Sequence, residues 1–250
     1  MRLSWLIIFS IMLVIAVVAF SYALNKKIRI MSLSASEERY DHPGTRFKNF
    51  VVQVLGQKKM LNEPYGVVHF IIFWGFILIV LGELPLIFEG LFPDYSFFFL
   101  GTNPYFYMVK DLMTALVVVG LFGGAYRRWV LKPVRLSRTP EAAIIVILVI
   151  GVIVTEWISS GAKVALDPEA AYSLAFMYHA FASMFSGFSH DTLVAIEDSF
   201  WWIHMCILLG FLVYIPNSKH MHLLAVHPNV YFSSLKPIGA QITTMDLEDE

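Results

Sequence analysis

WWIHMCILLGFLVYIPNSKHMHLLAVH, residues 201–227, is the most informative stretch of the sequence, because it is long and apolar and holds four of the eight histidines. His204 and His222 are 18 residues apart, or five turns of an α-helix. A continuous helix would carry both rings on one face, about 27 Å apart. That distance approaches a hydrocarbon thickness of about 30 Å and predicts one imidazole near each membrane surface. An unsatisfied polar group in lipid costs several kcal/mol, so both rings are expected to have partners.

The composition indicates an integral membrane protein. Of the 250 residues, 58% are hydrophobic and 15% are charged, against about 25% charged in a typical soluble domain. The single cysteine, Cys206, excludes disulfides, four-cysteine zinc sites and cysteine-ligated iron–sulfur clusters within these residues. The net charge of −1 says nothing about nucleic acid, but the lack of a basic aromatic patch predicts no nucleic-acid partner.

Hydrophobic runs predict five membrane spans. They cover residues 5–24, 64–88, 104–126, 141–160 and 198–216, with the last continuing as helix to residue 222. The first run also resembles a signal peptide, but its length and the lysines that follow favour an uncleaved helix over residues 1–24. Residues 46–56 could form a short amphipathic helix. Residues 170–188 could form either an interfacial helix or a sixth span.

The charges of the loops orient the chain. The loops after the first and third spans are basic and carry Lys26, Lys27, Arg29, Arg39, Arg46, Lys48, Lys58, Lys59, Arg127, Arg128, Lys132, Arg135 and Arg138. The positive-inside rule then places the N-terminus outside and the C-terminus in the cytoplasm. We therefore expect an all-α integral membrane protein with a five-transmembrane-helix bundle. Residues 25–63 would form a cytoplasmic loop, and residues 239–250 an acidic flexible tail.

This topology places His69, near the inner end of the second span, level with His222. Two neutral imidazoles that face each other across helices are the axial ligands of a six-coordinate haem b. Small residues would allow the helices to approach closely at Gly66, Gly75, Gly82 and Gly210. The alternatives are an interhelical hydrogen bond for His69 and a solvated basic flank for His222. Zinc is a weaker interpretation, because no third or fourth ligand is grouped near the pair.

His204 could bind a second haem nearer the outer face. Its partner would be His179, ahead of His190, because Ile79 stands where a second histidine of the second span would lie.

Three further polar residues have two interpretations each. Glu83, near the outer end of the second span, is either a proton-exchange group at a quinone site or an interfacial acid in contact with water. Arg127 and Arg128 are either partners of haem propionates or positive-inside anchors.

The histidine pattern resembles a known family. Residues 204–222 read H-x11-P-x-S-K-x2-H, which is similar to the cytochrome b (gamma) subunit of respiratory nitrate reductase. The resemblance is closer to the membrane domain of heterodisulfide-reductase-related iron–sulfur proteins, where this helix typically ends P-[YF]-S-K-x-x-H-x-L before a small residue, Pro and Asn. AVHPN at residues 225–229 and HFIIFWGF at residues 69–76 are similar to that group as well.

The resemblance implies a set of cofactors and partners. Nitrate-reductase-type subunits hold two stacked haems b between histidines of the second and last spans. Matched residue by residue, His69 and His222 correspond to the inner haem and His204 to one ligand of the outer haem. Ile79 replaces the fourth ligand, which is a departure from the pattern. The resemblance also implies a separate cytoplasmic iron–sulfur subunit and a quinone substrate.

We therefore expect residues 64–238 to form a haem-binding membrane region of four helices, with one or two haems b. The expected function is that of a membrane cytochrome b subunit of a quinone-linked oxidoreductase, in the cytoplasmic membrane of a bacterium or archaeon. It would pass electrons between a cytoplasmic iron–sulfur or flavoprotein partner and the quinone pool. The competing hypothesis is a haem-free membrane anchor, or a proton or solute transport component, with structural histidines.

Overall fold

A computed structural model describes residues 3–33, 37–92, 97, 100–134, 136, 138–167 and 172–235, and its regular structure there is entirely helical. The α-helices are α1 (Leu3–Met31), α2 (Pro43–Phe50), α3 (Gly66–Leu91), α4 (Pro104–Tyr126), α5 (Pro140–Leu166), α6 (Phe176–Met184), α7 (His190–Tyr214) and α8 (His222–Tyr231). Short π-helical segments follow α2 and α4, and 3₁₀ turns lie at Met60–Asn62, Ile215–Asn217 and Lys219–Met221.

Five of these helices are long and apolar enough to cross a membrane, which confirms the expected fold class. They are Leu3–Met31, Gly66–Leu91, Pro104–Leu131, Pro140–Leu166 and His190–Asn217. Helix α6, within the apolar run at residues 170–188, has nine residues and is too short to cross. A sixth span is therefore not found in the described part of the chain. The predicted tail at residues 239–250 lies outside the described residues.

Prolines and side-chain caps mark the first turns of three of the long helices. Pro104 and Pro140 occupy the first turns of α4 and α5, where a missing N–H has no cost. The Asn103 side chain accepts hydrogen bonds from the first backbone N–H groups of α4, and the Ser189 side chain does so for α7. These caps fix the ends of the two helices.

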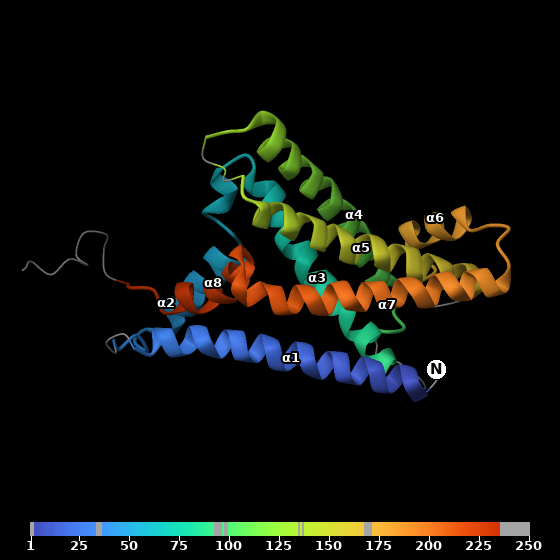
Figure 1. The fold of residues 1–250 in the computed structure, drawn as a ribbon. Helices are drawn as coiled ribbons and strands as arrows, with labels where there is room; N and C mark the ends of the chain where they lie inside the picture. Colours follow the sequence, from blue (N-terminus) through green and yellow to red (C-terminus); the bar gives the residue numbers. More distant parts are fainter. Residues whose placement is uncertain are drawn as a thin grey trace, which may run out of the picture.

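The bundle has two ends that differ in charge. Helices α1 and α4 end, and α3, α5 and α8 begin, at the end that carries the basic loops, which we call the basic end. The opposite end, here the far end, carries α6 and the start of α1 (Figure 1). Helix α3 packs on α4, and α7 packs on α5 and α1 (Figure 1).

The last span does not continue as a regular helix to His222, contrary to the expectation above. Helix α7 ends at Tyr214, and Ser218 is extended with φ −121° and ψ 176°. Pro216 has no N–H to continue the helical ladder, and the Ser218 hydroxyl accepts the His220 N–H instead. The same-face relation of His204 and His222 therefore does not hold, and a separate turn positions His222.

Two glycines of α3 allow close packing against α4, whereas the small residues were expected to bring α3 close to the last span. A Cβ on Gly75 would lie 2.2 Å from a Val117 side-chain atom of α4, and one on Gly82 would lie 2.3 Å from Lys110 Cε. A Cβ on Gly210 of α7 would meet nothing within 4 Å. Small residues therefore bring α3 against α4.

The loop that follows α1 is held at the basic end. The expected amphipathic helix at residues 46–56 is confirmed as α2 with a π-helical turn at Val51–Leu55. Arg46 is buried, and its guanidinium donates to the carbonyl of Tyr231 at the end of α8, to that of Ser233 just beyond it, and to Asp41. This clamp joins the loop to α8, next to the start of α3.

Candidate functional site

Three histidines meet at the basic end, on elements far apart in the sequence. The ring centroids of His69, on α3, and His222, at the start of α8, are 6.5 Å apart. The His220 ring centroid lies 5.4 Å from that of His222. The expected juxtaposition of His69 and His222 is therefore present in the structure, reached through a turn instead of a continuous helix.

Both His69 and His222 use Nδ1 as a hydrogen-bond donor. His69 Nδ1 lies 2.9 Å from the Gln57 amide oxygen, and His222 Nδ1 lies 2.8 Å from the Lys219 carbonyl. A carbonyl oxygen can only accept, so Nδ1 carries the proton and Nε2 of each neutral ring keeps its lone pair. This is the tautomer that a hydrogen-bond acceptor beside the ring imposes on a metal-ligating histidine.

Gln57 is held in an unusual backbone conformation. It is buried and has a φ of 46°, in the left-handed region that non-glycine residues seldom adopt. The conformation follows the π-helical turn and directs the amide towards His69. Strain of this kind persists where the surroundings impose it, often at functional sites. Sequence reasoning missed Gln57, because its loop position gives no signal.

His220 has a different environment from its two neighbours. Its ring packs on Phe211 at 5.4 Å and on Phe76 at 6.5 Å between centroids. Burial, followed by the nearby His222 and His69 rings, lowers the pKa of His220 to about 4, so it is neutral at pH 7. His220 is thus an apolar-packed neighbour that separates the His69–His222 pair from the bundle interior.

The His69–His222 pair fits a bis-imidazole cofactor better than a zinc ion. Two metal–nitrogen bonds of about 2 Å, with about 1 Å from each nitrogen to its ring centre, place two centroids about 6 Å apart. The observed centroid distance is 6.5 Å. Within the described residues, no group of three or more His, Cys, Asp or Glu side chains is arranged to hold a metal ion.

The two arginines expected near this site have aromatic partners. The Arg127 guanidinium lies 3.6 Å from the ring centroid of Tyr65, four residues before His69, and Arg128 lies 5.9 Å from the Trp129 ring. Both contacts are cation–π geometries. Arg127 is thereby held beside the start of α3.

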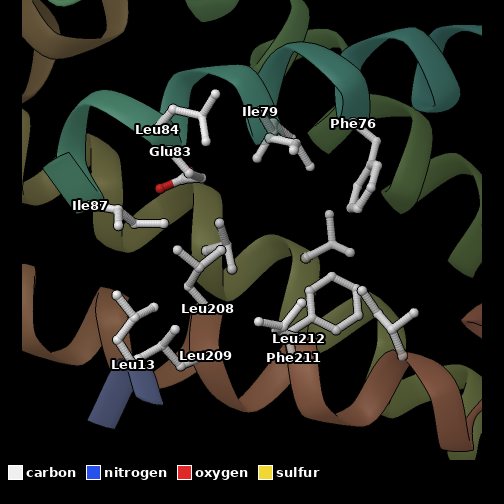
Figure 2. Close-up of a pocket in the computed structure, with 14 residues that line it drawn as sticks. Leu13, Phe76, Ile79, Glu83, Leu84, Ile87, Leu208, Leu209, Phe211 and Leu212 are labelled. Carbon is white, nitrogen blue, oxygen red and sulfur yellow. The ribbon is translucent and has the colours of Figure 1, made fainter. Parts of the chain in front are cut away.

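An apolar cavity of about 180 Å³ lies between α3 and α7 (Figure 2). Its walls come mainly from these two helices, with Leu13 of α1 and two valines of α5. At one end it reaches Phe76 and Phe211, which contact His220. Among the described residues, Glu83 is the only polar one that lines it (Figure 2). The cavity therefore joins a carboxylate in the far half of the bundle to the histidines at the basic end.

Glu83 forms a buried pair with His204. The Glu83 side chain is buried, and its Oε2 lies 2.7 Å from His204 Nε2. His204 Nδ1 lies 3.0 Å from the Val152 carbonyl and 3.1 Å from the Thr155 hydroxyl. The carbonyl requires a proton on Nδ1, so a second proton is shared between Nε2 and the carboxylate. Both nitrogens of His204 are engaged, unlike those of His69 and His222.

The other two candidate outer histidines lie apart from His204. His179, on α6, interacts electrostatically with Asp111 of α4, and its Nε2 is buried without a hydrogen-bond partner in the described structure. His190 is exposed at the start of α7, 3.9 Å from the Asp191 carboxylate. Within the described contacts, neither residue meets His204.

A second buried ionic group was missed by the sequence analysis. Lys110 of α4 donates to Glu156 of α5, and the Tyr178 hydroxyl of α6 donates to the same carboxylate oxygen at 2.6 Å. Asp111 accepts the backbone N–H of Met177 at 2.7 Å. The signal was available, because Lys110, Asp111 and Glu156 all lie inside predicted spans, where ionisable side chains are costly and usually functional.

Comparison with known proteins identifies two bacterial relatives. The chain is 30% identical over 245 residues, 98% of its length, to "Probable iron-sulfur-binding oxidoreductase FadF" of Bacillus subtilis (strain 168). It is 27% identical over 248 residues, 94% of its length, to "EtfAB:quinone oxidoreductase" of Syntrophomonas wolfei subsp. wolfei.

The chain spans about a third of the length of both relatives, 35% and 34%. No protein-family model matches it, and no solved structure does. The expected likeness to iron–sulfur oxidoreductases is thus found, whereas no cytochrome b family is identified.

Proposed function

We propose that this multi-pass membrane protein is the cytochrome b component of a quinone-linked iron–sulfur oxidoreductase. It would pass electrons between a partner at the basic end and quinone in the membrane. The proposal rests chiefly on one observation, the 6.5 Å approach of two imidazoles that both donate through Nδ1. The printed names of the two relatives supply the iron–sulfur and quinone chemistry.

His69 and His222 would hold one haem b, which supplies reversible one-electron transfer when bound. Gln57 and the Lys219 carbonyl fix the ring tautomers and orientations, and Phe76 and Phe211 exclude water from the interior side. Arg127 and Arg128, at the same end, are the candidates to pair with propionates. These 250 residues include a single cysteine, so they cannot themselves hold a cysteine-ligated cluster. A partner with an iron–sulfur or flavin centre would dock at this end, beside the proposed haem.

Glu83 would be the quinone contact. In the described part of the chain it is the one polar side chain that lines the apolar cavity, and its Oε1 is buried there with no hydrogen-bond partner. A buried acceptor of this kind normally has a partner, so it is suited to the polar head group of a quinone. Fourteen residues of helix separate Glu83 from His69, about 21 Å along the axis.

We assign His204 to the Glu83 pair and not to a second haem. A metal ligand needs one uncommitted ring nitrogen, whereas both nitrogens of His204 are engaged. His179 has an unpartnered Nε2 but lies against Asp111. A two-haem protein would have to break the His204–Glu83 contact, so one haem per chain is the proposed content.

The second candidate function is a haem-free proton transport component. The buried Glu83–His204 and Lys110–Glu156 pairs favour it, because they would serve proton movement without any haem. The two functions differ in their absorption spectra.

The test is a reduced-minus-oxidised spectrum of the purified chain, with haem and protein quantified on the same sample. We expect a b-type α-band and one haem per polypeptide. A chain expressed with adequate haem supply that shows no such band would overturn the cytochrome proposal in favour of the haem-free one. Two haems per polypeptide would return His204 to the list of ligands.

A further inference from the structure

The Lys110–Glu156 pair is buried among four helices and is next to the Glu83–His204 pair. The Lys110 ammonium lies directly over Gly82, where an added Cβ would be 2.4 Å from Nζ. Gly82 precedes Glu83, and Thr155, which contacts His204 Nδ1, precedes Glu156. Backbone neighbours on α3 and α5 therefore join the two pairs into one buried group.

Hydroxyl groups continue this network towards the far end. The Tyr178 hydroxyl donates to Glu156 at 2.6 Å, and the Tyr172 ring centroid lies 5.4 Å from that of Tyr178. Burial raises the pKa of both phenols above their usual range, so both keep their protons. Lys163 Nζ lies 5.7 Å from the Tyr172 ring centroid and is paired with Glu89 at 3.1 Å.

The Glu89–Lys163 pair is the point where the network reaches solvent. The Lys163 side chain is 36% exposed and the Glu89 side chain 30%, whereas those of Lys110 and Glu156 are 1% and 3% exposed. Groups with exchangeable protons thus extend from a partly exposed ion pair to the carboxylate of the cavity. Hydrogen bonds join some of these groups, and ring contacts or neighbouring backbone positions join the others.

We infer that this network is a proton path between the quinone cavity and the far end of the bundle, running through Glu83, His204, Lys110, Glu156, Tyr178 and Tyr172 to the Glu89–Lys163 pair. The inference rests on the proposed function, because it takes Glu83 as the quinone contact. Oxidation of one quinol to quinone releases two electrons and two protons. The electrons leave towards His69 and His222, and the protons leave towards the opposite end; quinone reduction reverses both.

Two features distinguish this network from a purely structural one. A structural buried network is stable when every polar atom is paired, yet Glu83 Oε1, Glu156 Oε2 and Asp111 Oδ1 are buried without partners among the described residues. These free acceptor atoms are positions at which a proton or a water molecule can be received.

The charges around the network also leave protonation open. The other titratable groups that face it are Asp111 and Tyr107 of α4, His179 of α6 and Glu197 of α7. The carboxylates of this region therefore outnumber its two lysines, Lys110 and Lys163, so not every carboxylate has a lysine partner.

The experiment measures how fast menadiol, a naphthoquinol, reduces the haem of the purified holoprotein, in H2O and in D2O. Each menadiol delivers two electrons to two protein molecules. The main variant is Lys110→Met/Glu156→Gln, which removes both charges together and leaves Tyr178 an acceptor. The second variant is Tyr178→Phe, which removes one hydroxyl. The matched controls are Glu38→Gln/Lys48→Gln, two exposed charges between α1 and α3, and Tyr105→Phe, an exposed tyrosine of α4.

We expect the double variant to slow haem reduction at least tenfold and Tyr178→Phe to slow it severalfold, with an increased solvent isotope effect and unchanged haem content. The two controls should stay within twofold of the wild type. Unchanged rates in both network variants, with menadiol still reducing the haem, would overturn the proton path and leave the cytochrome proposal intact. A wild-type chain without haem would overturn the proposed function, and the path with it.

Discussion

The histidines near the two ends of the cavity differ in what their Nε2 atoms contact. At the basic end, His69 and His222 donate through Nδ1, and their Nε2 atoms make no hydrogen bond among the described contacts. In the far half, His204 also donates through Nδ1, but its Nε2 contacts Glu83. The same residue type is therefore suited to the proposed ligation at one site and to proton sharing at the other. The partner of Nε2 decides which chemistry is available.

The two sites also differ in how they are stabilised. The His69–His222 pair is near the end of the bundle, and its Nδ1 atoms contact uncharged acceptors, the Gln57 amide and the Lys219 carbonyl. The far half contains two buried pairs of ionisable side chains, Glu83–His204 and Lys110–Glu156, and removing one member of a pair leaves the other buried without it. Variants should therefore affect cofactor content at the basic end and folding stability or proton transfer in the far half.

The largest effect is expected from His222→Ala, which removes a proposed ligand and should abolish haem binding. His69→Ala should do the same. His220→Ala is the matched control, since that ring packs on Phe76 and Phe211, and it should retain most of the haem. A difference spectrum with haem quantified per polypeptide measures all three. Equal loss in His220→Ala and His222→Ala would contradict the assignment.

The single substitution Lys110→Ala should have the next largest effect. It leaves the Glu156 carboxylate buried with only the Tyr178 hydroxyl, which should lower the free energy of unfolding by about 3–5 kcal/mol. Denaturant unfolding of the detergent-solubilised protein would measure it. The double variant Lys110→Met/Glu156→Gln should be clearly more stable than the single one. If the two are equally unstable, the ion pair does not have the proposed role.

Gln57→Ala tests whether the hydrogen bond to His69 Nδ1 supports haem binding at the basic end. It removes the acceptor of the His69 Nδ1 proton but leaves both proposed ligands in place. Loss of such a partner typically weakens metal affinity about 10–100-fold. Titration of the apoprotein with haem would measure the change, with Gln53→Ala of the same loop as the control. Wild-type affinity in Gln57→Ala would show that this hydrogen bond does not support ligation.

Gly82→Ala should have the smallest effect, and one confined to the far half. The added methyl group would overlap Lys110 and displace it, which should cost about 1–3 kcal/mol in unfolding free energy. Gly210→Ala, which meets nothing within 4 Å, is the control and should be neutral or slightly stabilising, since alanine favours a helix. Haem content should be unchanged in both variants. A harmless Gly82→Ala would show that Lys110 can move without loss.

The sequence by itself determined the membrane class and the five spans. Length and hydrophobicity set these features, because a bilayer requires about 20 apolar residues for each helix. The proximity of His69 and His222 was predictable because the second and last spans run in opposite directions, which places the two residues at the same depth in the membrane. His204 and His222 do not lie on one continuous helix, contrary to the prediction, because Pro216 and Ser218 interrupt the helix between them.

Only the tertiary structure decided which partner each imidazole has. The loop position of Gln57 carries no sequence signal, and the Glu83–His204 pair joins residues that are 121 positions apart. The Lys110–Glu156 pair depends on how α4 and α5 rotate about their axes, which packing fixes and hydrophobicity along the chain does not. Burial makes these pairings energetically decisive, because a polar atom inside the bundle cannot take a hydrogen bond from water instead.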